Sequence, residues 1–149
     1  EFSGVFGTNV VSNDTLGTSV AVPGAPPLGK ITSAIAHKGG GVSLAAVGEV
    51  GNLDQRAYYY PTVSATPTTF TRPYFVGNAQ VADNGTRTVF TTSQYGSLSG
   101  KVSVASKPSK GSTWTGFKNV PNSYTAGGIE RMVTAGKHIR LVGVSGKAI

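Results

Sequence analysis

The sequence predicts an all-β protein built from repeated four-stranded units, and three observations support this fold class. Gly, Thr and Ser number 21, 17 and 15, together more than a third of the 149 residues, and they suit turns and strands better than helix interiors. No segment of twelve or more residues has the apolar spacing of an amphipathic helix, the best candidate being the short segment 129–135. Strand-like runs instead recur roughly every 8–12 residues, and parts of the sequence repeat.

Eleven runs rich in β-branched and aromatic residues are the predicted strands. Turn residues such as Gly39-Gly40-Gly41 and Asn84-Gly85 separate them. In chain order the runs are Val5–Val11, Thr18–Val22, Ser33–His37, Val42–Val47, Gln55–Tyr60, Thr68–Val76, Thr86–Thr92, Lys101–Ala105, Thr113–Val120, Arg131–Ala135 and Ile139–Val144. The segment 22–29 contains three prolines, each lacking a backbone donor, so residues 1–30 are predicted to form an extended arm of a single domain, 1–149.

An internal repeat gives the period of the units. Thr69-Phe70-Thr71 matches Thr113-Trp114-Thr115, and Gly51-Asn52-Leu53 matches Gly96-Ser97-Leu98. These offsets of 44 and 45 residues are typical of four-stranded propeller blades. The last unit, 129–149, has room for two strands only. We therefore expect the N-terminal arm to pair with this C-terminal segment or with a neighbouring chain.

Residues 107–114, Lys-Pro-Ser-Lys-Gly-Ser-Thr-Trp, carry a family resemblance. They resemble a degenerate Asp-box of the bacterial-neuraminidase type, whose pattern is Ser-x-Asp-x-Gly-x-Thr-Trp. Gly111, Thr113 and Trp114 match it, whereas Ser109 stands where the pattern has Asp. The resemblance implies a propeller in which these residues form the turn between the third and fourth strands of a blade. Thr69 and Phe70 would occupy the same place one unit earlier, and all five residues would be scaffold rather than ligand site.

Three units are fewer than the four to eight blades of a propeller. Two chains could form a six-unit ring, the chain could belong to a larger propeller, or three units of this length could form a β-trefoil. If the repeat is coincidental, a β-sandwich is the alternative architecture.

The charge distribution predicts an anionic partner. Residues 1–83 carry four basic and five acidic residues, whereas residues 84–149 carry nine basic residues and one acidic residue, Glu130. A glycan or another anionic surface would complement the second part. The basic residues are dispersed and do not alternate with aromatic residues, which argues against nucleic acid. No apolar run of about 18 residues predicts a membrane span.

Catalytic chemistry is not predicted. Glu49 and Asp54 flank Gly51-Asn52 and are interpreted as loop charges rather than the paired carboxylates of a glycosidase. His37 and His138 are interpreted as turn residues. The sequence lacks the Gly-x-Ser-x-Gly nucleophile elbow, and it has no cysteine. We predict no catalytic residue, metal site or cofactor.

The most binding-like feature is Arg56 with Tyr58, Tyr59 and Tyr60. Side chains alternate along a strand, so three successive tyrosines cannot all face one core. Exposed tyrosines could stack on sugars or anchor a protein contact. The alternative is a strand buried on both faces between two sheets.

The predicted function is therefore a non-enzymatic binding module, lectin-like or of the attachment type, extracellular or on a virion surface. A structural virion or assembly subunit, such as a capsid, decoration or tail component, is the alternative, and a fragment of a glycoside hydrolase is the third. Self-association or membership of a larger assembly is expected, and a cytoplasmic location stays open.

Overall fold

A computed structural model gives the fold, and the prediction of an all-β chain is confirmed. The structure describes residues 2–6, 9–13, 20–21, 30–37, 41–49, 55–71, 76–94, 102–121 and 129–143, which form thirteen strands and no helix. It follows that this part of the chain holds no helix long and apolar enough to cross a membrane.

Every described strand ladder is antiparallel, and the strands fall into four sheets that follow chain order. Sheet A consists of β1 (Phe2–Phe6), β2 (Asn9–Asn13) and β3 (Val20–Ala21). Sheet B consists of β4 (Lys30–Ala36), β5 (Val42–Glu49), β6 (Gln55–Tyr60) and β7 (Thr68–Thr71). Sheet C consists of β8 (Val76–Asp83), β9 (Arg87–Gln94), β10 (Val102–Pro108) and β11 (Lys118–Asn119). Sheet D consists of β12 (Ile129–Ala135) and β13 (His138–Gly143).

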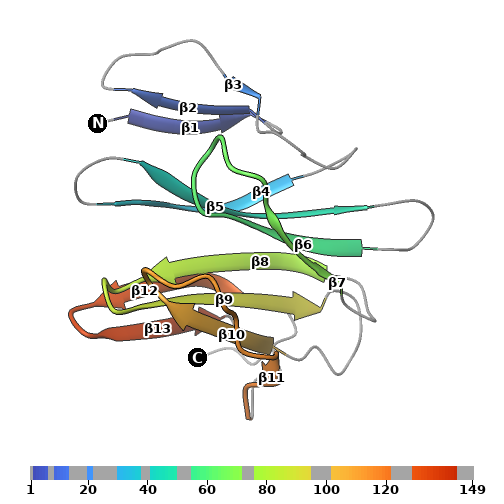
Figure 1. Ribbon diagram of the computed structural model, residues 1–149. Helices are drawn as coiled ribbons and strands as arrows, with labels where there is room; N and C mark the ends of the chain where they lie inside the picture. Colours follow the sequence, from blue (N-terminus) through green and yellow to red (C-terminus); the bar gives the residue numbers. More distant parts are fainter. Residues whose placement is uncertain are drawn as a thin grey trace.

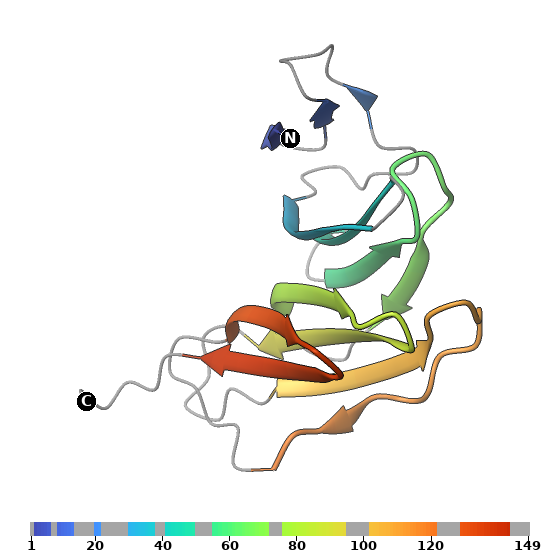
Figure 2. The ribbon, with the colours of Figure 1, turned by 90° about the vertical axis from the view of Figure 1, so that its left-hand side faces the viewer.

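The sheets are stacked, with sheet A at the sheet B end and sheet D beside sheet C (Figures 1 and 2). β8, the first strand of sheet C, contacts β4 and β5 of sheet B on one side and β12 of sheet D on the other. The first strands of sheets B, C and D thus lie next to one another, and the later strands of sheets B and C extend outward from them.

A backbone irregularity recurs in these three first strands. The register shifts between Ile31 and Ser33 in β4, between Val76 and Asn78 in β8, and between Ile129 and Arg131 in β12. Such a bulge re-aims the extra residue. At the first one, the Thr32 hydroxyl donates to the carbonyl of Ala79 at 2.6 Å, which ties β4 directly to β8.

Alternation along the strands of sheet B builds two cores. On the face toward sheet C, buried Ala45, Val47, Ala57 and Tyr59 pack against Ala79, Val81 and Phe90. On the opposite face, Val42, Leu44, Ala46, Tyr58 and Tyr60 form a second buried cluster. Sheet B is therefore buried on both faces, which accounts for the apolar and aromatic residues at successive positions of β5 and β6.

Two hairpin turns lie close together at one edge of sheets C and D. Gly85 reverses the chain between β8 and β9 with φ of 83°, and Gly136 does so between β12 and β13 with φ of 58°. Glycine adopts this left-handed conformation without the strain that a side chain would introduce. These turns position the candidate pocket described below.

The strand predictions hold in most of the chain and are wrong in three places. The run Val5–Val11 was expected to be one strand, but it is covered by two paired strands, β1 and β2. The run Thr68–Val76 is likewise split between β7 and β8, and most of β8 was not predicted. In the run Thr113–Val120 only Lys118 and Asn119 form a strand. The preceding residues form a loop whose Trp114 and Phe117 side chains pack against the core between sheets B and C.

The N-terminal residues pair among themselves. β2 lies between β1 and β3, and no ladder among the described residues joins these strands to β12 or β13. Sheets B and C have four strands each and sheet D has two.

Candidate functional site

The structure corrects the expectation that the tyrosines of β6 present an exposed binding platform. Tyr58, Tyr59 and Tyr60 are 5%, 4% and 1% exposed. Tyr59 faces sheet C, whereas its two neighbours face the second core. Burial of both faces, the alternative weighed for this strand, is what the structure contains. Arg56 is half-buried on the same strand, paired with Gly48 and Thr71.

Aromatic rings fill the space between sheets B and C. Phe70 lies 5.4 Å from Trp114 and 5.2 Å from Phe117 in edge-on arrangements, measured between ring centroids. Tyr59 lies 5.0 Å from Trp114, and the Phe90 ring lies between 5.0 and 6.4 Å from each of the four other rings. Edge-to-face pairs at these distances are favourable beyond their burial.

Phe70 and Trp114 were expected at equivalent places in successive units, but they meet in one interface. Phe70 is on β7, the last strand of sheet B, and faces sheet C; Trp114 is in the loop after β10 of sheet C and packs back onto sheet B. Thr69 and Thr113 are exposed. The two segments that share the Thr-aromatic-Thr pattern therefore supply the two sides of one contact.

Lys107 organises the loop of residues 107–114. Its side chain is only 7% exposed, and its ammonium donates to the carbonyls of Gly111 at 2.9 Å, Ser109 at 3.3 Å and Pro108 at 3.4 Å. The same ammonium lies 5.5 Å from the centre of the Tyr59 ring and 5.6 Å from that of Trp114. Burial lowers the pKa of Lys107, and the negative charge of Asp83 opposes that shift.

Asp83, at the end of β8, binds the loop of residues 107–114 through Ser109. The Ser109 hydroxyl donates to Asp83 Oδ1 at 2.8 Å, the Gly85 amide to the same atom at 2.6 Å, and the Thr88 hydroxyl to Oδ2 at 2.5 Å. Burial alone would raise the pKa of Asp83. The three hydrogen bonds and the nearby His37 outweigh it, so the pKa lies below its usual value.

His37 and Ser43 of sheet B form a second polar network at the interface between sheets B and C. His37 Nε2 lies 2.7 Å from the Ser43 hydroxyl, and that hydroxyl donates to the carbonyl of Pro61 at 2.8 Å. Ser43 is 1% exposed and its proton is directed at a carbonyl, so His37 does not activate it as a nucleophile. The Tyr59 hydroxyl joins this network through Ser43 and Thr88, while burial raises its pKa. The network is structural.

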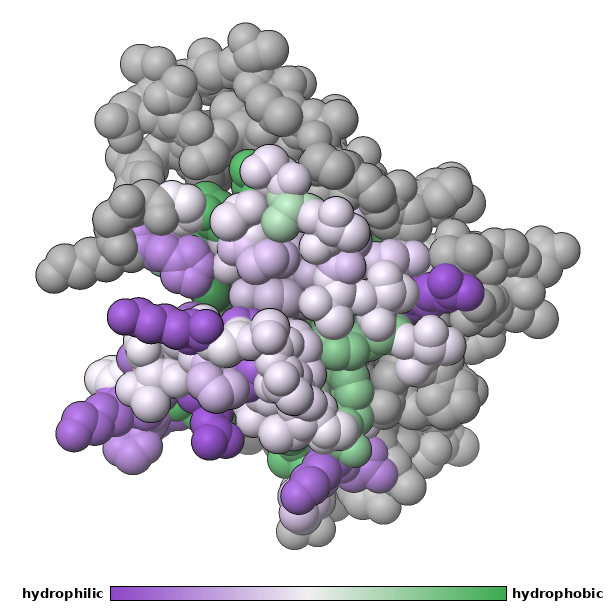
Figure 3. All heavy atoms as spheres, in the orientation of Figure 1, coloured by the Kyte–Doolittle hydropathy of each residue, from purple (hydrophilic) through white to green (hydrophobic). Residues whose placement is uncertain are grey.

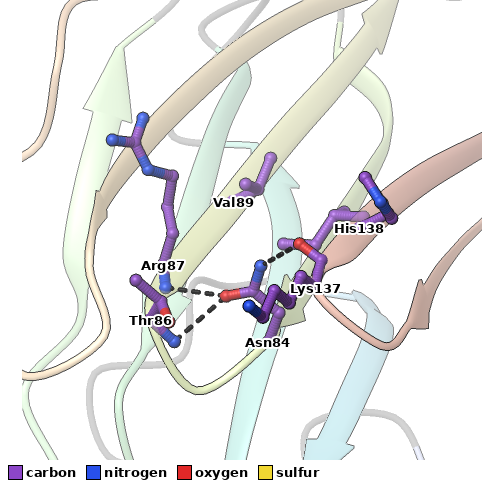
Figure 4. A pocket seen from close by; sticks show the side chains of 7 residues that line it. Asn84, Thr86, Arg87, Val89, Lys137 and His138 are labelled. Atoms are coloured by element: carbon purple, nitrogen blue, oxygen red, sulfur yellow. Dashed lines mark hydrogen bonds between the residues drawn. The ribbon is translucent and has the colours of Figure 1, made fainter.

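An open pocket of about 400 Å³ lies between the β8–β9 and β12–β13 hairpins (Figure 4). It is lined by Asn84, Thr86, Arg87, Val89, Lys137, His138 and Ile139. Asn84 holds the two hairpins together: its Oδ1 accepts from the amides of Thr86 and Arg87 at 3.0 and 2.8 Å, and its Nδ2 donates to the Lys137 carbonyl at 2.7 Å. One amide side chain therefore fixes the spacing of both walls.

The pocket is basic. Arg87, Lys137 and His138 are exposed, and no acidic residue belongs to the lining. Arg87 and Val89 alternate with Thr88 along β9, so the Asp83 carboxylate bound by Thr88 is on the opposite face of sheet C. Figure 4 shows Arg87 and His138 on either side of Val89. This arrangement suits a ligand that carries negative charge and also contacts the apolar side chain of Val89.

Sequence reasoning missed this pocket. His138 was interpreted as an exposed turn residue; it is exposed, but it is the first residue of β13 and follows the turn. Arg87 and Lys137 were not singled out. The available signal was the pairing of basic residues with the turns Asn84-Gly85 and Gly136-Lys137. The side chain of Glu49 and all of Asp54 lie outside the described residues.

Comparison with protein-family models, curated proteins and solved structures found no match to this chain.

Proposed function

We propose that this chain is a non-enzymatic binding module, extracellular or on a virion surface, that holds an anionic ligand in the pocket between the β8–β9 and β12–β13 hairpins. The observation that carries the proposal is that Arg87, Lys137 and His138 all line one pocket whose described lining contains no acidic residue. Charge of one sign in a concave site favours a ligand of opposite charge.

A propeller-like scaffold is part of the proposal. Sheets B and C are four-stranded meanders, and bulges recur in the first strands of sheets B, C and D. The Asp-box-like residues Gly111, Thr113 and Trp114 lie between β10 and β11, the third and fourth strands of sheet C. Adjacent first strands and a turn at this position support blades rather than a trefoil or a sandwich.

The proposal excludes catalysis by the described polar groups. The Asp83 carboxylate accepts three hydrogen bonds, the Ser43 hydroxyl is buried, and Lys107 is bound by loop carbonyls. Each group is thus committed to the fold. A glycosidase would need two carboxyl groups facing a common cleft.

Binding to immobilised acidic and neutral glycans tests the function. We expect acidic glycans to bind and the substitution Arg87→Ala to weaken binding about tenfold, since a hydrogen bond to a charged group contributes about 1.5–3 kcal/mol. Lys118→Ala, which changes an exposed lysine on β11, is the matched control and should bind like the wild type. Absence of binding to any glycan, or glycoside hydrolysis that Glu49→Gln abolishes, would contradict the proposal.

A structural subunit of an assembly is the second candidate, and the outer face of sheet D favours it. Val133 and Val142 are 37% and 51% exposed, and the ladder register places both on the face opposite buried Met132. Sheets B and C, in contrast, bury their apolar faces against each other.

We expect the solution mass from light scattering to be a multiple of the chain mass if this face docks a second copy. The substitution Val142→Arg should then return the protein to a monomer, because it would add a third positive charge to the face that already carries Arg131 and Arg140. Ser64→Arg, which places the same charge on an exposed loop of sheet B, is the control. A monomeric wild type at all concentrations would remove self-assembly as the function.

A further inference from the structure

We infer that the ligand is a sulfated polysaccharide, bound along a basic edge formed by Lys110, Arg87, Lys137 and His138. This inference rests on the proposed function, because it names the ligand class of the same pocket and extends the site to Lys110.

Three chain segments bring these basic residues to one edge. The Ser109 amide donates to the Thr86 carbonyl at 3.0 Å, which places the loop carrying Lys110 against the β8–β9 turn. On the other side of that turn, Asn84 binds the Lys137 carbonyl at 2.7 Å. Lys110 and the Lys137–His138 turn therefore flank Arg87, and all four side chains are exposed. A row of basic residues that extends beyond the pocket fits a ligand with several anionic groups along its length.

The described carboxylate of Asp83 lies on the face of sheet C opposite the pocket. Both of its oxygens accept hydrogen bonds, from the hydroxyls of Ser109 and Thr88 and from the Gly85 amide. Strongly hydrophilic residues gather on the side of the molecule where the hairpins of sheets C and D end (Figure 3). The edge thus presents cations without a competing carboxylate in the pocket lining.

The remaining pocket groups favour sulfated sugar over nucleic acid. No aromatic side chain belongs to the lining, and Tyr59, Phe90 and Trp114 are packed between sheets B and C. Single-stranded nucleic acid is usually held by exposed aromatic platforms that stack on bases. A sugar ring can instead rest on Val89 and Ile139. The Arg87 guanidinium donates from Nη1 to the Ser106 hydroxyl at 3.2 Å, and its remaining N–H groups can donate to a sulfate.

Affinity for heparin, chemically desulfated heparin of the same length, and a single-stranded oligonucleotide of matched charge tests this inference by calorimetry. We expect heparin to bind and the desulfated chain to bind at least tenfold more weakly. Affinity should fall as the salt concentration rises from about 0.05 to 0.5 M, because the Debye length shortens severalfold. The substitutions Arg87→Ala, Lys110→Ala and Lys137→Ala should each weaken heparin binding about three- to tenfold, and Lys118→Ala should not.

Each of the following outcomes would contradict one specific part of the inference or of the proposed function. Equal binding of heparin and its desulfated form, weakened by Arg87→Ala, would overturn the sulfate assignment and leave the proposed function intact. Tighter binding of the oligonucleotide would replace the polysaccharide by nucleic acid. Wild-type affinity of Lys110→Ala would confine the site to the pocket and overturn the extended edge. Failure to bind any glycan would overturn the proposed function itself. Circular dichroism and melting temperature of the exposed-residue variants separate loss of binding from loss of folding.

Discussion

Replacing Phe90 by alanine is expected to lower the free energy of unfolding by about 3–5 kcal/mol, the range found for large-to-small changes in protein cores. The Phe90 ring is fully buried and lies 5.0 Å from Phe70, 6.1 Å from Trp114 and 6.3 Å from Tyr59. Truncation would remove the ring on which these side chains pack and would leave a cavity between sheets B and C. Urea unfolding followed by tryptophan fluorescence gives the measurement.

Val133→Ala is the matched control for this experiment. Val133 is on the outer face of sheet D, where it is 37% exposed, and its truncation should change stability by about 0.5 kcal/mol or less. A loss below about 1 kcal/mol for Phe90→Ala would mean that sheets B and C do not pack through this ring. The substitution Trp114→Ala probes the same interface from the loop side and should agree with Phe90→Ala in sign.

The all-β class could be predicted because the local signals in this chain agree with one another. Gln55–Tyr60 was predicted with the bounds that β6 has, since three successive tyrosines close to turn residues favour a strand. β8 was missed because Gly77, Asn78 and Gln80 interrupt its apolar pattern. Ala79 and Val81 nevertheless face sheet B, and the Gln80 amide donates to the Thr32 carbonyl at 3.2 Å. A backbone carbonyl 48 residues away satisfies a buried side-chain amide that the local pattern assigns to the surface.

The candidate site was less accessible to sequence reasoning because it depends on contacts between distant segments. Tyr58 and Tyr60 were candidates for exposure, and only the two-sided burial of sheet B removes them. Lys107 has a residue type that is seldom buried, and its position follows from carbonyls that the loop turns toward it. Arg87 and Lys137 are 50 residues apart in the chain. They line the same pocket because Asn84 joins their hairpins.

Substituting Asp83 by asparagine is expected to cost about 2–3 kcal/mol at pH 7. The carboxylate accepts from a buried hydroxyl, an amide and the Ser109 hydroxyl, and hydrogen bonds to a charged acceptor contribute about 1.5–3 kcal/mol. Asparagine keeps the shape but turns an NH₂ group toward at least one of these donors. It also removes the negative charge that favours the charged form of the buried Lys107 ammonium.

This loss has a definite dependence on pH. The pKa of Asp83 is lower in the folded protein than its ordinary value of 3.8, so the folded state binds this proton less readily than the unfolded chain does. The stabilisation from the carboxylate is therefore fully present above the unfolded pKa and is lost as the pH falls through the folded pKa. The difference in unfolding free energy between wild type and Asp83→Asn should be constant from pH 7 to about pH 5 and should shrink toward pH 2.

The loop offers a matched pair of serines that locates this stabilisation at the Asp83 contact. Ser109→Ala removes a donor to the carboxylate, whereas Ser112→Ala removes an exposed hydroxyl three residues later. Ser109→Ala should destabilise wild type by about 1–2 kcal/mol and the Asp83→Asn variant by less, since the two residues share one interaction. Ser112→Ala should change neither background by more than about 0.5 kcal/mol. Additive losses for Asp83→Asn and Ser109→Ala would mean that the carboxylate stabilises the hairpin through Thr88 and Gly85 alone and does not anchor the loop.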